Sequence, residues 1–384
     1  MRTSPPVPYG TRMSTTRDRS TQPESLLVPA AHSLPSNAAY LAHLDAGAGE
    51  PPLIRLGSNE NSEPPSPRVR EALERSYDDA NRSPSTRSPL RLALAARFGV
   101  SPERILLGAG STELIDATIR TFVRAGDEVI LPRPSWPVFR RRLAAVEADV
   151  VDVPLSAGPH SYDYDLDALL GAVTDRTKLI VLCSPNNPTG NSLGLDAVRR
   201  CAQAGPMLLL DAAYADFDPG VDLSPLVHEH RNVVLTRTFS KAYCLAGLRV
   251  GYVVGDADVL DHVDRFLVPG SSVSSASLHA GLAALEDEEY RARQVARILA
   301  ERERLLGRLR DLGVTAYESR GNFVAFDAAA HPGQAVGLVG EVRARGVVIR
   351  AMDEGIVRVS VGTPSENDAA VAAIAAVRSA AAAA

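Results

Sequence analysis

Lysine is rare in this chain, and one of its copies lies in a segment suited to covalent chemistry. Among the 41 lysines and arginines, only Lys178 and Lys241 are lysines. A lysine side chain can lose its proton and act as a nucleophilic amine, whereas an arginine side chain stays protonated. A chain that uses arginine for general positive charge should therefore keep lysine where an amine is required. Lys178 precedes an apolar run and is typical of the solvated start of a strand, so Lys241 is the candidate nucleophile.

Three further polar residues follow apolar runs and could act together with this amine. Asp211 comes directly after residues 207–210, Tyr214 follows it closely, and Asn187 lies in a proline-rich turn. A pyridoxal phosphate site needs a lysine for the aldehyde, a carboxylate for the pyridine nitrogen and donors for the phenolic oxygen. Asp211 could pair with the ring nitrogen, and Tyr214 and Asn187 could bond the phenolic oxygen. Alternatively, Asp211 only caps a strand or helix, and Asn187 is only a structural residue of its turn.

A glycine-rich segment, Gly108–Thr112, lies between a predicted strand and a predicted helix. Its amides and the helix N-terminus could cradle a phosphate group, although the segment could also be a tight turn with a serine or threonine cap. The candidate phosphate ligands are the amides of Ala109, Gly110 and Ser111 and the side chains of Thr238, Ser240 and Arg249. Trp136, the only tryptophan of the sequence, could stack on the cofactor ring or simply pack in the core.

These residues follow short apolar runs that alternate with helical patterns. The predicted strands are residues 105–107, 128–131, 148–153, 179–183, 207–210 and 232–236. Such alternation indicates an α/β fold with a mainly parallel sheet covered by helices on both faces. Ligand sites in such sheets gather outside the carboxyl ends of the strands, where the candidate residues stand. Residues 114–123 and a tail that contains Val371, Ile374 and Val377 are predicted helices.

Composition excludes several function classes. The length of 384 residues exceeds what one hydrophobic core usually serves, so two domains are expected. A net charge of −5 offers no basic surface for nucleic acid, and no apolar run is long enough to span a membrane. Cys183, Cys201 and Cys244 are too few for a disulfide framework or a zinc site, so we expect no metal and a cytoplasmic setting. Residues 1–38 are predicted to be a disordered extension without a secretory signal.

The order of these motifs resembles that of the fold-type I (class I and II) aminotransferases. Asn187–Gly190 is followed by Asp211–Tyr214 and then by Ser240–Lys241, with Arg249 a little further on. The segments most similar to the histidinol-phosphate aminotransferase branch are Leu56–Asn61, Gly108–Glu113, Leu245–Gly251 and Arg358–Pro364. The resemblance extends over about residues 53–378 and implies pyridoxal 5'-phosphate as the cofactor.

The resemblance also implies a role for each matching residue. Lys241 would form the internal aldimine and move the proton at the amino carbon, while Asp211 would pair with the pyridinium nitrogen. Arg358 would clamp the anionic group of the substrate, a role suited to a bidentate guanidinium, and Arg350 would be a second substrate-side arginine. For both arginines the alternative is a surface charge that follows a strand. The remaining residues implied at the substrate are Ser58, Asn59 and Asn322.

The family organisation supplies the expected architecture, the pyridoxal-phosphate-dependent transferase fold type I. A large domain at residues 57–285 would hold a mainly parallel seven-stranded sheet with helices on both faces. A smaller α+β domain would occupy residues 286–384, and residues 39–56 would form an arm that joins it. Members are typically homodimers with active sites at the subunit interface.

Departures from the family pattern concentrate at the substrate end. The family sequence Asp-Glu-Ala-Tyr is Asp211–Tyr214 here, with alanine replacing the glutamate, which should leave the ring-nitrogen contact intact. A family tyrosine that reaches the neighbouring subunit's cofactor phosphate is replaced here by Ser83, between Arg82 and Pro84. A Tyr-Asn pair that helps to hold a substrate phosphate in the family is replaced here by Ser271–Ser272.

We therefore expect an aminotransferase that moves an amino group between a small amino acid, or an amino alcohol phosphate, and a 2-oxo acid, with a specialised substrate. The alternatives are another enzyme on the same scaffold, such as a decarboxylase, cyclase or oxidase, and a histidinol-phosphate aminotransferase. A non-enzymatic regulator would need a DNA-binding domain, for which residues 1–52 are too short. No nucleic-acid or membrane partner is expected.

Overall fold

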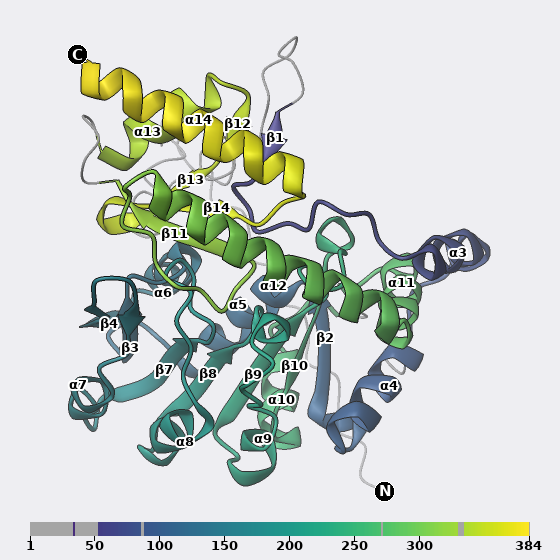
Figure 1. Cartoon of the computed structure of the whole chain (residues 1–384). Helices are drawn as coiled ribbons and strands as arrows, with labels where there is room; N and C mark the ends of the chain where they lie inside the picture. The colour runs from purple at the N-terminus through teal and green to yellow at the C-terminus, as the bar shows by residue number, and fades with distance from the viewer. Residues whose placement is uncertain (1–33, 35–52, 86–87, 270–271, 329–333, 384) are drawn as a thin grey trace, which may run out of the picture.

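The computed structural model describes residue 34 and residues 53–85, 88–269, 272–328 and 334–383. A seven-stranded sheet forms its lower part in Figure 1. The strands in spatial order are β2 (Ile105–Ala109), β10 (Val250–Val254), β9 (Val233–Thr238), β8 (Met207–Asp211), β7 (Thr177–Cys183), β3 (Glu128–Arg133) and β4 (Asp149–Pro154). Neighbours are parallel except that β10 is antiparallel to both β2 and β9. The predicted mainly parallel sheet is confirmed, and all predicted strands lie in it; β10 was not predicted.

Alternating side chains along each strand bury both faces of this sheet. On β7, Leu179 and Val181 belong to one hydrophobic cluster, and Ile180 and Leu182 belong to another. The first cluster includes residues of α5 (Ser111–Phe122), α6 (Pro137–Ala145) and α10 (Ala257–Asp264). The second includes residues of α4 (Pro89–Phe98), α7 (Leu166–Gly171), α8 (Leu195–Gln203), α9 (Leu226–Glu229), α11 (Ser275–Glu286) and α12 (Glu288–Asp311). Helices therefore cover both faces, as predicted.

A second group of elements packs above this sheet, and the long helix α12 passes between the two (Figure 1). Its antiparallel sheet consists of β11 (Phe323–Asp327), β14 (Ile356–Ser360) and β13 (Arg350–Ala351). Beside it, β1 (Ile54–Arg55) pairs in parallel with β12 (Val347–Val348). The helices of this group are α13 (Gln334–Arg343) and α14 (Pro364–Ala383). In α14, Val371, Ile374 and Val377 are buried, which confirms the predicted terminal helix.

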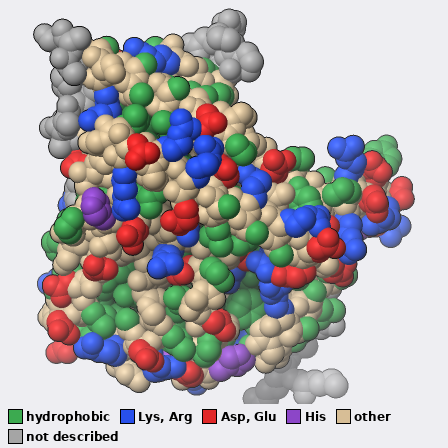
Figure 2. Space-filling view, in the orientation of Figure 1, with side chains coloured by type: hydrophobic (Ala, Val, Ile, Leu, Met, Phe, Trp, Pro, Cys, Tyr) green, Lys and Arg blue, Asp and Glu red, His purple; other side chains and the backbone are tan. Residues whose placement is uncertain are grey.

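The remaining elements lie at the periphery. The hairpin strands β5 (Ser156–Ala157) and β6 (Tyr162–Asp163) follow β4, and α3 (Pro67–Ser76) packs against α11 at one side of the molecule. Positive and negative side chains are interspersed over the face shown in Figure 2. Among the described residues, no helix is long and apolar enough to cross a membrane. Except for residue 34, the predicted extension 1–38 lies outside the described residues, as does most of the predicted arm 39–56. The domain boundaries stay a prediction.

Candidate active site

The strands that carry the candidate residues end at one edge of the seven-stranded sheet. β7, β8 and β9 are mutually parallel, and β2 has the same direction because β10 is antiparallel to both β2 and β9. Ala109, Cys183, Asp211 and Thr238, the last residues of these strands, therefore lie at the same edge. A cavity of about 400 Å³ lies there, and residues from the second sheet complete its wall.

This cavity brings together most of the predicted site residues. Those that line it are Ser58, Asn59, Ser111, Trp136, Asn187, Asp211, Tyr214, Thr238, Ser240, Lys241, Arg249, Arg350 and Arg358. Three predicted residues are not part of this lining. Ala109 and Gly110 precede Ser111 in the loop after β2, and Asn322 is fully buried behind Asn59, to whose carbonyl oxygen its Nδ2 donates at 3.1 Å. Asn322 thus supports the wall of the cavity instead of facing it.

The amine of Lys241 lies in this cavity, and the residue is half-buried. Its Nζ donates a hydrogen bond of 3.0 Å to the carbonyl oxygen of Ser58. Burial, followed by the positive charge of Arg358, lowers the pKa of Lys241 to about 7, and Arg249 acts in the same direction. A substantial fraction of the side chain is therefore the neutral amine near neutral pH, which is the form that can act as a nucleophile or a base.

Asp211 is held rigidly at the end of β8. Its Oδ1 accepts a hydrogen bond of 3.0 Å from the hydroxyl of Thr236 and one of 3.1 Å from the amide of Ala213. Burial nevertheless raises the pKa of Asp211 to about 6. A cation placed against Oδ2, such as a protonated ring nitrogen, would favour the ionised carboxylate and offset this burial.

The hydroxyl of Tyr214 is a second fixed group. It accepts a hydrogen bond of 2.9 Å from Asn59 Nδ2 and one of 3.2 Å from Asn187 Nδ2. The ring of Phe323 meets the tyrosine ring edge-on at 5.1 Å between centroids. Burial raises the pKa of Tyr214, so the phenol keeps its proton. Because the oxygen already accepts both amides, the hydroxyl hydrogen remains to donate to an oxygen in the cavity.

The loop between β2 and α5 is the candidate anion site. The N-cap of α5 is Gly110 at φ 82°, and no side chain caps the first turn. A Cβ at Gly110 would lie 2.5 Å from Nη2 of Arg249, and a Cβ at Gly251 would lie 2.3 Å from the amide nitrogen of Ser111. The glycines therefore let a guanidinium and a second strand approach the helix N-terminus closely. Amides of a helix N-terminus beside a guanidinium fit a phosphate group.

Two hydroxyls are the remaining predicted side-chain ligands of this candidate anion site. Thr238 Oγ1 donates to Ser240 Oγ at 3.0 Å and accepts from the Ser240 amide at 3.1 Å, and both residues line the cavity. Trp136 also lines the cavity, and its indole meets Phe139 edge-on with centroids 5.3 Å apart. This packing contact fixes one edge of the indole and leaves the residue at the cavity wall, where a planar ring could bind.

The second sheet carries the two predicted substrate arginines. Arg358 is 3% exposed; its Nη1 donates to Asn187 Oδ1 at 2.5 Å and its Nη2 to the Gly57 carbonyl at 2.6 Å. Arg350 and Arg358 are register partners in the β13–β14 pair, so their side chains leave the sheet on the same face. Both line the cavity, where they present positive charge to an anionic ligand.

Sequence patterns missed several residues at this site. Thr236 reaches Asp211 through the β8–β9 register, and Glu113 Oε2 accepts from the Ala109 amide at 2.6 Å. Further residues in the cavity lining are Glu60, Thr112, Cys183, Ala213 and Ala246. Ser272 donates to the same Glu113 oxygen at 2.5 Å and lines a separate cavity. Its partner Ser271 lies outside the described residues.

Comparison with known proteins places the chain in a family. The model of aminotransferase class I and II matches residues 51–374. An aromatic amino acid aminotransferase of Mycobacterium sp. (strain KMS) is 37% identical over 337 residues, covering 84% of this chain and 92% of that protein. Histidinol-phosphate aminotransferase 2 of Caulobacter vibrioides is 37% identical over 328 residues, covering 83% and 85%.

The same relationship is visible in three dimensions. A crystal structure of histidinol-phosphate aminotransferase from Sinorhizobium meliloti in complex with pyridoxal-5'-phosphate is similar with a TM-score of 0.81 and 28% identity. The similarity covers 94% of this chain and 100% of that one. The resemblance based on the sequence motifs is thus confirmed. The chain belongs to the class I and II aminotransferases, a family of enzymes that depend on pyridoxal phosphate.

Proposed function

We propose that this enzyme binds pyridoxal 5'-phosphate at Lys241 and moves an amino group between an amino acid and a 2-oxo acid. The supporting observation is convergence: the Lys241 amine, the Asp211 carboxylate, the Tyr214 hydroxyl and the Arg249 anion site face one cavity of about 400 Å³. When bound, the pyridine ring accepts the electron pair released as the bond to hydrogen at the amino carbon breaks.

The protein would supply the remaining functions through its own side chains. The neutral amine of Lys241 would condense with the cofactor aldehyde with loss of water. Once the substrate amine has displaced it, the free Lys241 amine would take the proton from the amino carbon and deliver it to the cofactor carbon on the other side of the substrate nitrogen. Asp211 keeps the ring nitrogen protonated, and Tyr214 donates to the phenolic oxygen. The amides at the start of α5 and Arg249 hold the phosphate, so the reacting atoms stay aligned.

On the substrate side, we propose that Arg358 binds the carboxylate of the amino acid and that Arg350 serves a further anionic or polar group. The hydroxyl of Ser272 is engaged with Glu113 and faces a different cavity, which supports a substrate that is not held as histidinol phosphate would be. A carboxylate-bearing amino acid with a polar or bulky side chain is the proposed donor. Because the mycobacterial relatives are named aromatic amino acid aminotransferases, aromatic amino acids are the first to test.

Histidinol phosphate is the second candidate donor. The Caulobacter relative carries that name at the same 37% identity, and Arg350 could contact a phosphate. A substrate panel with a labelled 2-oxo acid, ranked by kcat/KM, tests both candidates. We expect amino exchange with an amino acid ahead of histidinol phosphate. If kcat/KM for histidinol phosphate exceeds that for every amino acid by about a hundredfold, or about 2.7 kcal/mol, the substrate assignment is reversed. Release of carbon dioxide or hydrogen peroxide without amino exchange would overturn the proposed reaction.

We also propose that the enzyme works as a cytoplasmic homodimer. Helix α3 projects from the body of the molecule (Figures 1 and 2). Two apolar side chains, Tyr77 directly after α3 and Leu92 on α4, are 81% and 52% exposed. A second copy could cover this surface. Sedimentation at the mass of a single 40.8 kDa chain over the concentration range of the assay would contradict the dimer.

A further inference from the structure

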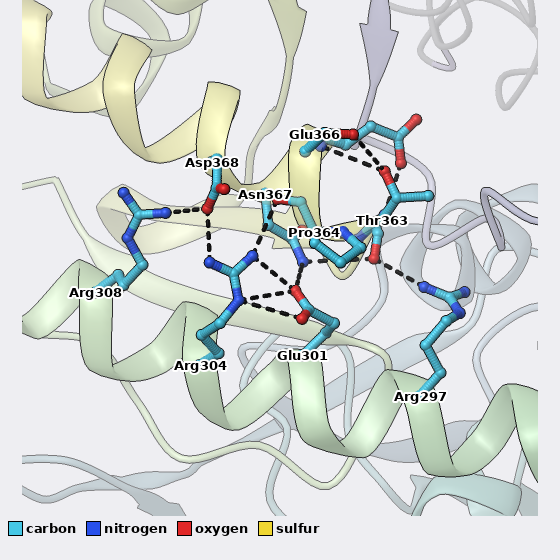
Figure 3. Close-up of polar contacts among 11 residues, drawn as sticks. Arg297, Glu301, Arg304, Arg308, Thr363, Pro364, Glu366, Asn367 and Asp368 are labelled. Carbon is cyan, nitrogen blue, oxygen red and sulfur yellow. Dashed lines mark hydrogen bonds and ion pairs between the residues drawn. The ribbon is translucent and has the colours of Figure 1, made fainter.

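One side of α12 carries a row of arginines that contact the turn after β14 and the start of α14 (Figure 3). Arg304 Nη2 donates to the Pro364 carbonyl at 3.0 Å, and its Nη1 pairs with Asp368 at 2.6 Å. Arg308 pairs with the same carboxylate of Asp368. Closer to the cavity, Arg297 Nη1 donates to the Gly362 carbonyl at 3.0 Å. These contacts fasten β14 and α14 to the long helix that lies against both sheets.

Arg297 differs from the other two arginines because it also contacts the segment whose residues 58–60 line the active-site cavity. Its Nη2 donates to Asn61 Oδ1 at 2.8 Å, and this oxygen also accepts from the Glu63 amide at 3.1 Å. The buried Gln294, one turn earlier on α12, accepts from Arg297 through Oε1 at 3.4 Å and orients the guanidinium. One side chain thus bridges the segment before α3 and the turn after β14.

The segment that contains Asn61 has no regular secondary structure between β1 and α3, so contacts with its surroundings determine its position. Its contacts are with the groups proposed to act on the substrate. Lys241 donates to the carbonyl of Ser58, and Arg358 donates to the carbonyl of Gly57. The Asn59 amide donates to Ser360 Oγ at 2.7 Å on β14. Any displacement of this segment would therefore move Asn59 and the carbonyl partners of Lys241 and Arg358.

We infer that Arg297 is a positioning residue for the amino acid substrate. By holding Asn61 and the Gly362 carbonyl at once, it fixes residues 58–61 against β14 and so sets the space in front of Arg358. This inference rests on the proposed role of Arg358 as the carboxylate-binding residue. The planar guanidinium suits the task because its separate donors reach two acceptors in a fixed geometry, whereas a lysine ammonium would act as a single point charge.

Steady-state kinetics with L-phenylalanine and 2-phenylethylamine, which lacks the carboxylate, would test the inference. Arg297→Met keeps the aliphatic length and removes the donors, and Arg297→Lys keeps the charge. We expect Arg297→Met to raise KM for L-phenylalanine about tenfold, equivalent to about 1.4 kcal/mol, with kcat little changed. kcat/KM for the amine should fall much less than kcat/KM for the acid, and Arg297→Lys should recover part of the loss.

Arg308→Met is the matched control, because Arg308 stands on the same side of α12 and does not contact residues 58–61. The Arg308→Met variant should have the wild-type kcat and KM for both substrates. An equal loss with the acid and the amine, or an equal loss in Arg308→Met, would overturn the inference and show a general structural effect. If the wild-type enzyme does not prefer the acid, the Arg358 assignment fails first and the inference fails with it.

A double-mutant cycle keeps the test independent of any single variant. Asn61→Ser shortens the side chain on the other side of the same contact and so withdraws its acceptor oxygen from Arg297 Nη2. If Arg297 acts through Asn61, the double variant Arg297→Met, Asn61→Ser should raise KM little more than either single variant. Additive effects would overturn the bridge, because they would show that the residues act separately.

Discussion

Thr236 and Asp211 face each other in the β8–β9 pair, and the threonine hydroxyl donates to Asp211 Oδ1 at 3.0 Å. The Ala213 amide donates to the same oxygen, so the carboxylate is oriented before any ligand binds. Burial still outweighs these donors and raises the pKa of Asp211 to about 6. At neutral pH the cofactor-free protein therefore holds an ionised carboxylate at a cost in stability, which a protonated ring nitrogen would offset.

Asp211→Asn separates this electrostatic role from cofactor binding. The asparagine keeps an acceptor for Thr236, and the cofactor should still attach at Lys241. Turnover should fall by a factor of about a thousand or more, at least about 4 kcal/mol in the barrier, because the ring nitrogen loses its anionic partner. A loss of only about tenfold in single-turnover kinetics would show that Asp211 is mainly structural.

The same variant has a second, opposite effect on stability. The folded pKa of about 6 lies above the ordinary value of 3.8, so the carboxyl stabilises the fold at low pH and loses that contribution as pH rises through 6. The shift corresponds to at most about 3 kcal/mol. At pH 8 we expect cofactor-free Asp211→Asn to unfold at the same or a higher temperature than the wild type. The difference in unfolding temperature, Asp211→Asn minus wild type, should be larger at pH 8 than at pH 4. A smaller difference at pH 8 would contradict this account.

The titration of Lys241 can be observed in the cofactor-free protein. Only the neutral amine attacks the aldehyde, so the attachment rate of pyridoxal phosphate should fall about tenfold per unit below pH 7. Arg358 lowers the pKa of Lys241, so Arg358→Met should move the midpoint to higher pH. Lys241→Ala and Lys241→Arg should not react. A wild-type midpoint near the ordinary lysine value, or attachment in Lys241→Ala, would contradict the assignment.

The strands and the central site residues could be predicted because short stretches of the sequence are enough to identify them. Lys241 is conspicuous among arginines, and Asp211 ends an apolar run that reads as a buried strand. Long-range register could not be predicted. Nothing near Thr236 shows that it faces Asp211, and chain order does not reveal that β10 inserts between β2 and β9.

The contacts that hold residues 58–61 in place could not be predicted from the sequence either. The resemblance implied Ser58 and Asn59 at the substrate, but the structure adds why they lie there. Asn59 meets Tyr214, which is distant in the sequence, and Asn322 supports Asn59 from behind. Such contacts arise only when the two sheets pack together, so no local pattern encodes them.

A buried ion cluster next to the site predicts a large effect on stability. Asp216 follows Tyr214 in a short 3₁₀ helix, Ala215–Phe217, and pairs with Arg237 and with Arg291 at 2.9 Å each. Asp216→Ala leaves the largely buried Arg237 without its carboxylate, whereas Arg291 keeps Glu288, and should lower the free energy of unfolding by about 3 kcal/mol. Denaturant titration measures this loss.

Asp258→Ala is the control for that measurement. Asp258 is 83% exposed and pairs with Arg231 at the surface, so its removal should change the stability little. Comparable losses in the two variants would show that burial does not strengthen the Asp216 cluster.

Two glycines allow a direct test of the anion site. Gly110 and Gly126 both have positive φ, 82° and 79°, so alanine strains the backbone at either position, by about 1–3 kcal/mol. Only at Gly110 would the new Cβ meet Arg249, 2.5 Å from Nη2, whereas nothing lies within 4 Å at Gly126. Gly110→Ala should therefore displace the guanidinium and weaken pyridoxal phosphate binding by about tenfold or more, about 1.4 kcal/mol. Gly126→Ala should show the backbone cost in thermal unfolding and keep wild-type cofactor affinity in equilibrium dialysis. Equal cofactor affinity in the two variants would mean that the phosphate binds away from α5.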